Sequence, residues 1–251
     1  YIDDCLAPWL EAKKSHDILI ATVHGQFKEY HDLGIEDNDK ETILRLCDLK
    51  LDDRIIDYLY IQNRPLEDKI YQSEAEIRDK GLQWLLEQNC DIIWLLDNDE
   101  RYTVEEINNI INYVKLPANE NKCWFSINFK NYILDGKQWI DGFCPPRIFR
   151  VNYGDWLLER FYYDNDLFYR QKRTIVGDLP GYYKGSIEGT PIPMYDKHWR
   201  LLGDKISKHI AHIKHLTWLH SNGKQKVQYQ LAHFGHCSYK WNEEKQELEI
   251  D

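Results

Sequence analysis

The sequence predicts an α/β fold in which short buried strands alternate with amphipathic helices. Apolar residues recur at helix or strand spacing in successive segments: 2–10 (helix), 17–23 (strand), 41–49 (helix), 58–61 (strand) and 77–88 (helix). The next segment, 91–96, is almost entirely apolar, as expected of a strand buried on both faces of a parallel sheet. Such alternation over residues 1–115 predicts a layered α/β domain with a mixed, mostly parallel central sheet.

Two capping boxes indicate where helices begin. The pairs Ser73 with Glu76, and Thr103 with Glu106, place a hydroxyl at the N-cap and a carboxylate three residues later. Apolar residues at helical spacing follow both pairs. We therefore expect one helix before the apolar run 91–96 and another directly after it.

The second half of the chain is predicted to contain more strands and loops. The expected elements are strands over 123–132, 147–151 and 209–218, and a helix over 224–234. Residues 175–195 are rich in glycine and proline, which predicts a long ordered loop. Because no linker or internal repeat interrupts the pattern, residues 1–251 are expected to form a single domain.

The charge balance excludes some classes of protein. The chain of 251 residues has 42 acidic and 32 basic residues, a formal net charge of −10. A nonspecific nucleic-acid binder needs a basic face, so nucleic acid is a disfavoured partner. No run approaches the 18 apolar residues of a membrane span, and the first residues lack the order of a signal peptide. The sequence therefore predicts a soluble, cytoplasmic protein.

Six cysteines are present, at positions 5, 47, 90, 123, 144 and 237. None forms a Cys-x-x-Cys pair, which argues against a zinc cage. A chain of this length does not need a disulfide framework, so we expect buried free thiols in a reducing compartment.

The most informative segment is the acidic turn Asp97-Asn98-Asp99-Glu100, between the apolar run and the second capped helix. Ligands of open α/β sheets bind at the carboxyl ends of strands, and carboxylates at i and i+2 can face one site there. Such hard oxygen ligands suit Mg²⁺ or Mn²⁺, which can bridge the phosphates of a substrate. A solvated turn is the alternative, because Asp and Asn favour turns.

In this context, residues 90–101 resemble the D-x-D-E strand end of the family 2-like glycosyltransferases with the GT-A fold. Residues 76–82 are similar to the helix start that this family places near the nucleotide base. Two further segments, Tyr1–Leu6 and Asp17–Gly25, are similar to the family's first helix and second strand. The resemblance implies a Rossmann-like GT-A domain, with a nucleotide-sugar-binding half at 1–115 and an acceptor half at 116–251.

The resemblance also implies site residues in this chain. Arg78, Asp79, Asp97 and Asp99 would contact the nucleotide sugar, although the family usually has Asn at the position of Asp79. His215 resembles the late histidine that completes many GT-A metal sites, so the implied metal ligands are Asp99 and His215, with Asp97 beside them. The implied cofactor is Mn²⁺ or Mg²⁺.

A second acidic segment supplies the candidate catalytic residues. Residues 164–170 look like the family's E-D-x-D-l-x-x-R, with Tyr163 at the position of the glutamate. A general base needs only one carboxylate within hydrogen-bond reach of the acceptor hydroxyl. Asp164 is the expected base in an inverting enzyme, with Asp166 next to it. An acidic surface loop explains this segment equally well.

The resemblance therefore implies a metal-dependent glycosyltransferase that moves a sugar from a nucleotide-diphosphate donor, with a UDP-sugar expected, to a carbohydrate or other hydroxyl acceptor. Aromatic residues of the second half could form an acceptor platform, although core packing is favoured for most of them: Trp124, Trp139, Trp156, Tyr162, Tyr163, Tyr182 and Tyr183. Two alternatives stay open: a nucleotidyltransferase, which would want a Gly-rich basic loop, and a catalytically inactive carbohydrate-binding domain of the same fold.

Overall fold

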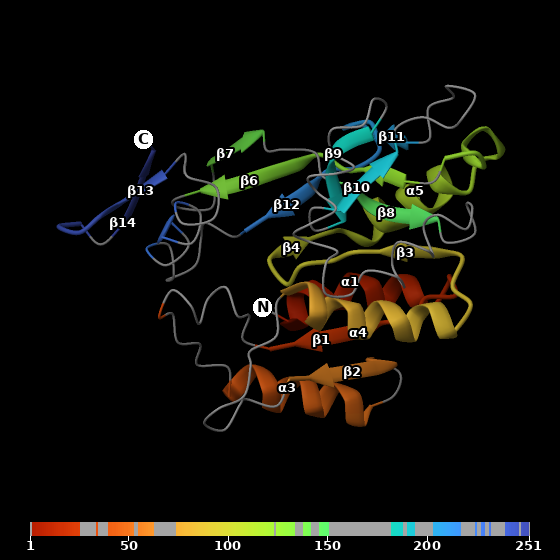
Figure 1. The fold of residues 1–251 in the computed structure, drawn as a ribbon, viewed down its shortest axis with the longest axis horizontal. Helices are drawn as coiled ribbons and strands as arrows, with labels where there is room; N and C mark the ends of the chain where they lie inside the picture. Colours follow the sequence, from red (N-terminus) through yellow and green to blue (C-terminus); the bar gives the residue numbers. More distant parts are fainter. Residues whose placement is uncertain are drawn as a thin grey trace.

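The computed structural model describes residues 2–25, 34, 40–52, 55–62, 74–122, 124–133, 138–141, 146–150, 182–187, 190–193, 203–216, 224, 227–228, 231, 239–245 and 247–250. The chain is an α/β protein with mixed sheets (Figure 1). No helix among these residues has the length and apolar character needed to cross a membrane.

The first elements form an α/β layer. They are α1 (Ile2–Lys13), β1 (Ala21–His24), α3 (Lys40–Leu51), β2 (Tyr58–Ile61) and α4 (Glu74–Glu87). The two strands pair in parallel, α4 packs on both of them and α3 packs on β2 (Figure 1). The strand at 58–61 and the three helices are confirmed. The strand expected over 17–23 is shorter and begins only at Ala21.

The apolar run 91–96 becomes a short strand in a four-stranded sheet. This sheet has the order β11-β5-β8-β3, from β3 (Ile92–Trp94), β5 (Trp124–Ser126), β8 (Pro146–Arg150) and β11 (Gly203–Lys205). Strand β8 is antiparallel to both of its neighbours, so β3, β5 and β11 all run in one direction, and β5 and β11 are paired in parallel. The sheet is thus mixed, as expected, and its one reversed strand, β8, lies between β5 and β3.

A second four-stranded sheet brings distant parts of the chain together. Its order is β4-β12-β6-β7, from β4 (Glu100–Arg101), β6 (Phe129–Ile133), β7 (Gln138–Asp141) and β12 (Ile213–His215). Strand β12 is antiparallel to β4 and parallel to β6. The acidic turn at 97–100 is thereby fixed beside residues that lie far from it in sequence.

Helix α5 (Val104–Val114) begins at the predicted capping box. The amide of Glu106 donates to Thr103 Oγ1 at 3.1 Å, and the amide of Thr103 donates to Glu106 Oε2 at 2.8 Å. Ile107, Ile110 and Val114 are buried on one face of the helix. The cap therefore fixes the start of α5 immediately after the acidic turn.

Removing this cap is expected to cost about 1 kcal/mol of the free energy of unfolding, the usual effect of a lost N-cap. The variant is Thr103→Ala, and the measurement is urea-induced unfolding followed by circular dichroism. Thr103→Ser keeps a hydroxyl at the cap and should lose much less. Equal losses in the two variants would contradict a capping role for the Thr103 oxygen.

One main core joins the two four-stranded sheets to helices α1 and α5. Its buried members are Trp9, Ala12, Tyr102, Ile107, Ile110, Val114, Phe125, Ile127, Phe129, Ile148, Ile206, Ala211 and Ile213. Trp9, Trp94 and Tyr102 meet edge to face, with ring centroids 4.6 Å to 5.5 Å apart. Because this cluster lies under both ends of the acidic turn, it holds the turn against rigid elements.

Two hairpins complete the described structure: β9 (Tyr182–Ile187) with β10 (Thr190–Pro193), and β13 (Tyr239–Asn242) with β14 (Glu247–Ile250). The expectation of a loop over 175–195 is therefore wrong for the part that forms the first hairpin. Gly and Pro disfavour regular secondary structure. A hairpin nevertheless tolerates them where the pairing of its strands is irregular, because only alternate backbone groups are paired. A shift in register between Pro191 and Ile192 is present here.

The remaining strand predictions are partly confirmed. Residues 123–132 divide into β5 and β6, residues 147–151 correspond to β8, and the described part of 209–218, residues 209–216, contains the short β12. Within 224–234, the described positions 224, 227, 228 and 231 are helical. A short 3₁₀ turn (Pro117–Asn119) follows α5.

Three of the six cysteines belong to the described residues. Cys5 is buried as expected, Cys90 is half-buried, and Cys47 is exposed, so burial is a wrong prediction for Cys47. The other three cysteines lie outside the described residues.

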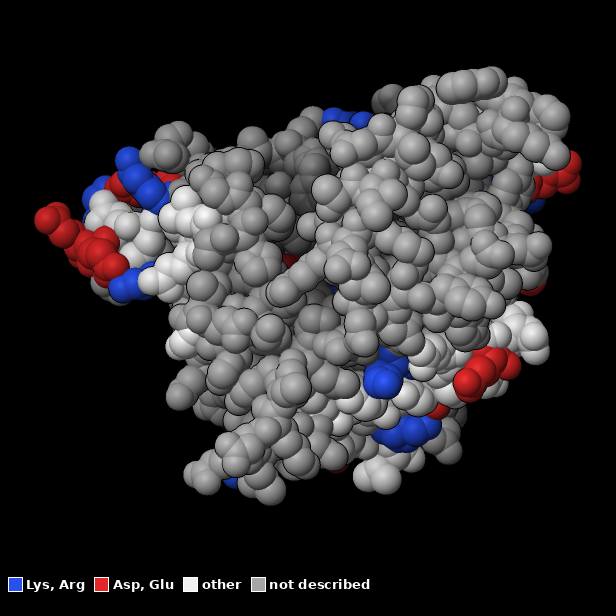
Figure 2. All heavy atoms as spheres, viewed as in Figure 1, with Lys and Arg blue, Asp and Glu red and all other residues white. Residues whose placement is uncertain are grey.

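Figure 2 places acidic and basic side chains side by side at the β13–β14 end of the molecule, where Lys245 pairs with Glu249 at 2.8 Å. That end does not carry charge of a single sign.

Candidate functional site

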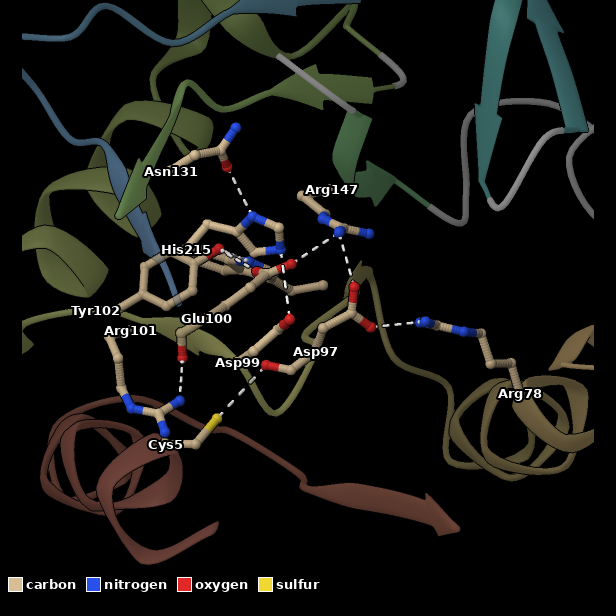
Figure 3. Close-up of polar contacts among 11 residues, drawn as sticks. Cys5, Arg78, Asp97, Asp99, Glu100, Arg101, Tyr102, Asn131, Arg147 and His215 are labelled. Carbon is tan, nitrogen blue, oxygen red and sulfur yellow. Dashed lines mark hydrogen bonds and ion pairs between the residues drawn. The ribbon is translucent and has the colours of Figure 1, made fainter. Parts of the chain in front are cut away.

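Three hydrogen bonds to backbone carbonyls hold the acidic turn in place. Within the turn, the amide of Glu100 donates to the carbonyl of Asp97 at 3.0 Å. The amide of Leu216, just after β12, donates to the carbonyl of Asp99 at 2.9 Å. From α1, the Cys5 thiol donates to the carbonyl of Asp97 at 3.7 Å (Figure 3), and burial raises the pKa of this thiol to about 12. The turn is therefore ordered before any ligand binds.

Asp97 lies between two arginines (Figure 3). Arg78 Nη2, from α4, is 2.6 Å from Asp97 Oδ1, and Arg147 Nη2, from β8, is 2.9 Å from Asp97 Oδ2. Burial on its own would raise the pKa of Asp97, but the two positive charges outweigh it and lower the pKa to about 2. Asp97 is thus an ionised carboxylate with both oxygens engaged by guanidinium groups.

Glu100 is the most buried member of the turn, with none of its surface exposed. Arg147 Nη2 is 2.7 Å from Glu100 Oε1, and the Tyr102 hydroxyl donates to Glu100 Oε2 at 3.2 Å. Trp94 Nε1 in turn donates to the Tyr102 oxygen at 3.3 Å. Burial raises the pKa of Glu100 to about 8, against the opposing effect of Arg147. Arg147 therefore links two carboxylates of the turn.

Asp99 points away from this arginine pair and toward β12 (Figure 3). His215 Nε2 is 3.5 Å from Asp99 Oδ2, and both side chains are largely buried, with 13% and 14% of their surface exposed. The other ring nitrogen of His215, Nδ1, is 2.7 Å from the side-chain oxygen of Asn131 on β6. The Phe129 ring lies tilted against the imidazole, with centroids 4.9 Å apart. The histidine is thus held on three sides.

The structure accordingly brings together four of the residues that the sequence singled out: Arg78, Asp97, Asp99 and His215. Asp79 belongs to α4, but its side chain lies outside the described part, as do the whole residues Asp164 and Asp166. Of the aromatic candidates, Trp124 is buried against Gly203, which places it in the core. The side chains of the other aromatic candidates are not among those described.

Sequence reasoning missed Arg147 and Asn131 as parts of the site. Arg147 had one available signal, a cation at the start of a segment whose next residues, Ile148 and Phe149, are apolar and buried. Such a cation needs a buried anion as partner. Asn131 had no comparable signal, because its importance comes from its alignment with His215 across β6 and β12.

The donor set of Asp99 and His215 fits a divalent cation. Two ligand atoms that each lie about 2.1 Å from one ion are at most about 4.2 Å apart, and the 3.5 Å observed is within that limit. Among the described residues, no group of three or more His, Cys, Asp or Glu side chains is arranged to hold a metal. Mg²⁺-type sites that act on phosphates commonly use few protein ligands and take the others from substrate and water. An ion here would depend on substrate oxygens in the same way.

Comparison with known proteins identifies no relative of this chain. No protein-family model, no curated protein and no solved structure matches the chain.

Proposed function

We propose that this chain is a metal-dependent glycosyltransferase of the GT-A fold, which moves a sugar from a nucleotide-diphosphate donor to a hydroxyl acceptor. The observation that carries the proposal is the approach of His215 Nε2 to Asp99 Oδ2 at 3.5 Å. These two residues were selected by resemblance, and their proximity depends on the pairing of β4 with β12. A carboxylate and an imidazole on a rigid sheet suit Mn²⁺ or Mg²⁺.

The two aspartates of the turn take different roles in this proposal. Asp99 and His215 would hold the ion, which when bound would supply a Lewis acid for the departing diphosphate. Asp97 is already engaged by Arg78 and Arg147, so it suits a hydrogen-bond acceptor for the nucleotide ribose better than a metal ligand. The ligand set proposed for the metal is thereby narrowed from three side chains to two.

The arginines favour an anionic ligand at this turn. Guanidinium groups bind phosphate through planar, paired donors. Arg78 has 20% of its side chain exposed and Arg147 has 8%, so Arg78 is the more accessible of the two. We therefore assign Arg78 to the nucleotide-diphosphate donor, and Asp79 next to it to the same ligand.

Deprotonation of the acceptor hydroxyl is assigned to Asp164, with Asp166 as its neighbour, if the enzyme inverts the anomeric centre. This assignment rests on sequence alone, because both residues lie outside the described part of the chain. The nucleotidyltransferase alternative has less support, since the sequence after β1 reads Gly-Gln-Phe-Lys, without a Gly-rich basic loop.

The proposal predicts a metal-dependent thermal shift with one nucleoside diphosphate. UDP, GDP, CDP and ADP are each added with Mn²⁺ or with EDTA, and the melting temperature is recorded. We expect UDP with Mn²⁺ to raise it by several degrees, because a ligand at 100 times its Kd stabilises a protein by about 2.7 kcal/mol. Asp99→Asn should abolish the Mn²⁺-dependent part of the shift.

The matched control is Asp48→Asn, an exposed aspartate on α3, which should retain the full shift. Release of UDP from a panel of UDP-sugars, with Mn²⁺ present, then separates a transferase from an inactive binding domain. If none of the four diphosphates raises the melting temperature of the wild-type protein, the result would count against both the transferase and the inactive binding domain.

A further inference from the structure

We propose that Asn131 is a positioning residue: it fixes His215 in the tautomer whose Nε2 lone pair is presented to a divalent cation at Asp99. The role of the cation rests on the proposed function, whereas the tautomer is a property of the metal-free protein. The inference is drawn from the register of three strands, the hydrogen bond between the two side chains and the orientation of the ring.

The strand register places the two side chains next to each other. In the parallel pair of β6 and β12, Asn131 is the direct partner of His215, and in the antiparallel pair of β4 and β12 the partner is Glu100. Directly paired residues of neighbouring strands point to the same face of a sheet. Asn131 and His215 are therefore aligned by backbone hydrogen bonding, independently of any ligand.

The hydrogen bond between them decides which ring nitrogen carries the proton. Asn131 Oδ1 lies 2.7 Å from His215 Nδ1 (Figure 3), and a carbonyl oxygen can only accept. Nδ1 therefore carries the hydrogen and donates it to Asn131. In the neutral ring, Nε2 is then the unprotonated nitrogen, the form in which imidazole binds a metal ion.

The ring orientation directs this nitrogen to Asp99. Nε2 lies 3.5 Å from Asp99 Oδ2, which is longer than the 2.7–2.9 Å of a charge-assisted hydrogen bond between a cationic nitrogen and a carboxylate. Phe129, two residues before Asn131 on β6, packs against the imidazole and limits its rotation. The lone pair of Nε2 and the carboxylate oxygen are thus arranged as two donor atoms for one cation.

General experience with metal sites gives the expected size of the effect. A ligating histidine usually donates its second ring N–H to an oxygen, and loss of that partner typically weakens metal binding 10–100-fold. We expect the same range for Asn131, because its oxygen supplies the contact that holds Nδ1. A carboxylate at the same position accepts the same hydrogen and should preserve the effect.

The test uses two variants of the full chain and one control. Asn131→Leu removes the acceptor at similar volume, and Asn131→Asp retains one. Asn108→Leu is the matched control, because Asn108 Oδ1 is 2.9 Å from His16 Nε2 in an asparagine–histidine pair between α5 and the segment that follows α1. Far-ultraviolet circular dichroism establishes that each variant is folded.

Two quantities are measured. Long-range ¹H–¹⁵N correlation spectra of protein with ¹⁵N-labelled histidine, recorded in EDTA, identify the tautomer of His215. Electron paramagnetic resonance of free Mn²⁺, with and without UDP, gives the affinity. We expect the wild type, Asn131→Asp and Asn108→Leu to keep the Nδ1–H tautomer and to bind Mn²⁺ within a few-fold of one another. Asn131→Leu should lose the Nδ1–H tautomer and bind 10–100-fold more weakly.

The outcomes separate this proposal from the proposed function. An unchanged tautomer in Asn131→Leu overturns the assignment of Asn131, whatever the metal affinity. A changed tautomer with unchanged Mn²⁺ affinity overturns the link between Asn131 and the cation. Absence of Mn²⁺ binding by the wild type, with or without UDP, contradicts the proposed function and the cation role with it, and the EDTA spectra still decide whether Asn131 sets the tautomer.

Discussion

Replacing Arg147 with methionine is expected to lower the free energy of unfolding by about 3–5 kcal/mol, the range for removing one partner of a buried ion pair. Only 8% of the Arg147 side chain is exposed, and its Nη2 atom contacts both Asp97 and Glu100. Methionine fills much of the volume of the arginine side chain. It leaves the wholly buried Glu100, and Asp97 beside it, without the Arg147 cation. Urea-induced unfolding at pH 8 measures the loss.

Arg45→Met is the matched control for this experiment. Arg45 makes a two-pronged contact with Asp3, but both side chains are about half exposed, at 46% and 59%. Exposed pairs contribute little to stability because water screens them. Losses of similar size in the two variants would contradict the role given to Arg147.

A second arm examines the cause of the loss. Glu100→Gln is introduced into both the wild type and Arg147→Met, and we expect it to stabilise Arg147→Met more, because the arginine that opposes the effect of burial on Glu100 is absent there. Methionine alone also removes the guanidinium from above the Phe129 ring, where it lies 5.2 Å from the centroid. A gain from Glu100→Gln that is equal in the two backgrounds would attribute the loss to that packing and not to charge at Glu100.

Local signals in the sequence were enough for the elements that precede and follow the acidic turn. The capping box at Thr103 and the apolar spacing of α5 involve residues within one or two turns of each other, and the structure has them as predicted. The strand at 58–61 is likewise bounded by polar residues on both sides. Interactions between residues that are close in the sequence can be predicted from the sequence itself.

Strand direction and the composition of the site could not be predicted in the same way. The apolar run 91–96 gave burial, but its antiparallel partner β8 lies far along the chain. Asp99 and His215 were paired by resemblance to a family, and the ladder of β4 with β12 brings them together. Asn131 acquires its role from the pairing of β6 with β12 within one sheet, and Arg147 acquires its role from contacts between the two sheets. No local pattern specifies either contact.

The burial of Glu100 leads to an unusual dependence of stability on pH. Burial raises the folded pKa of Glu100 from 4.5 to about 8. Between these values the folded state keeps a proton that the unfolded state has lost, so stability falls as pH rises, by at most about 1.4 kcal/mol per pH unit. Glu100→Gln removes this titration. Relative to the wild type, the variant should therefore gain on the order of 4 kcal/mol between pH 4.5 and pH 8.5.

The measurement is the free energy of unfolding of both proteins at half-unit steps of pH, in EDTA so that no divalent ion contributes. Asp97 does not interfere, because its pKa is lowered to about 2 and the stability it contributes is lost only as pH falls toward that value. Every other titratable group is present in both proteins, so the difference between the two curves isolates Glu100. Glu120→Gln, at an exposed glutamate after α5, controls for the loss of one carboxylate. If the wild-type and Glu100→Gln curves run parallel from pH 4.5 to 8.5, Arg147 keeps Glu100 ionised in the fold, and the buried site has a full ion pair where we expect a retained proton.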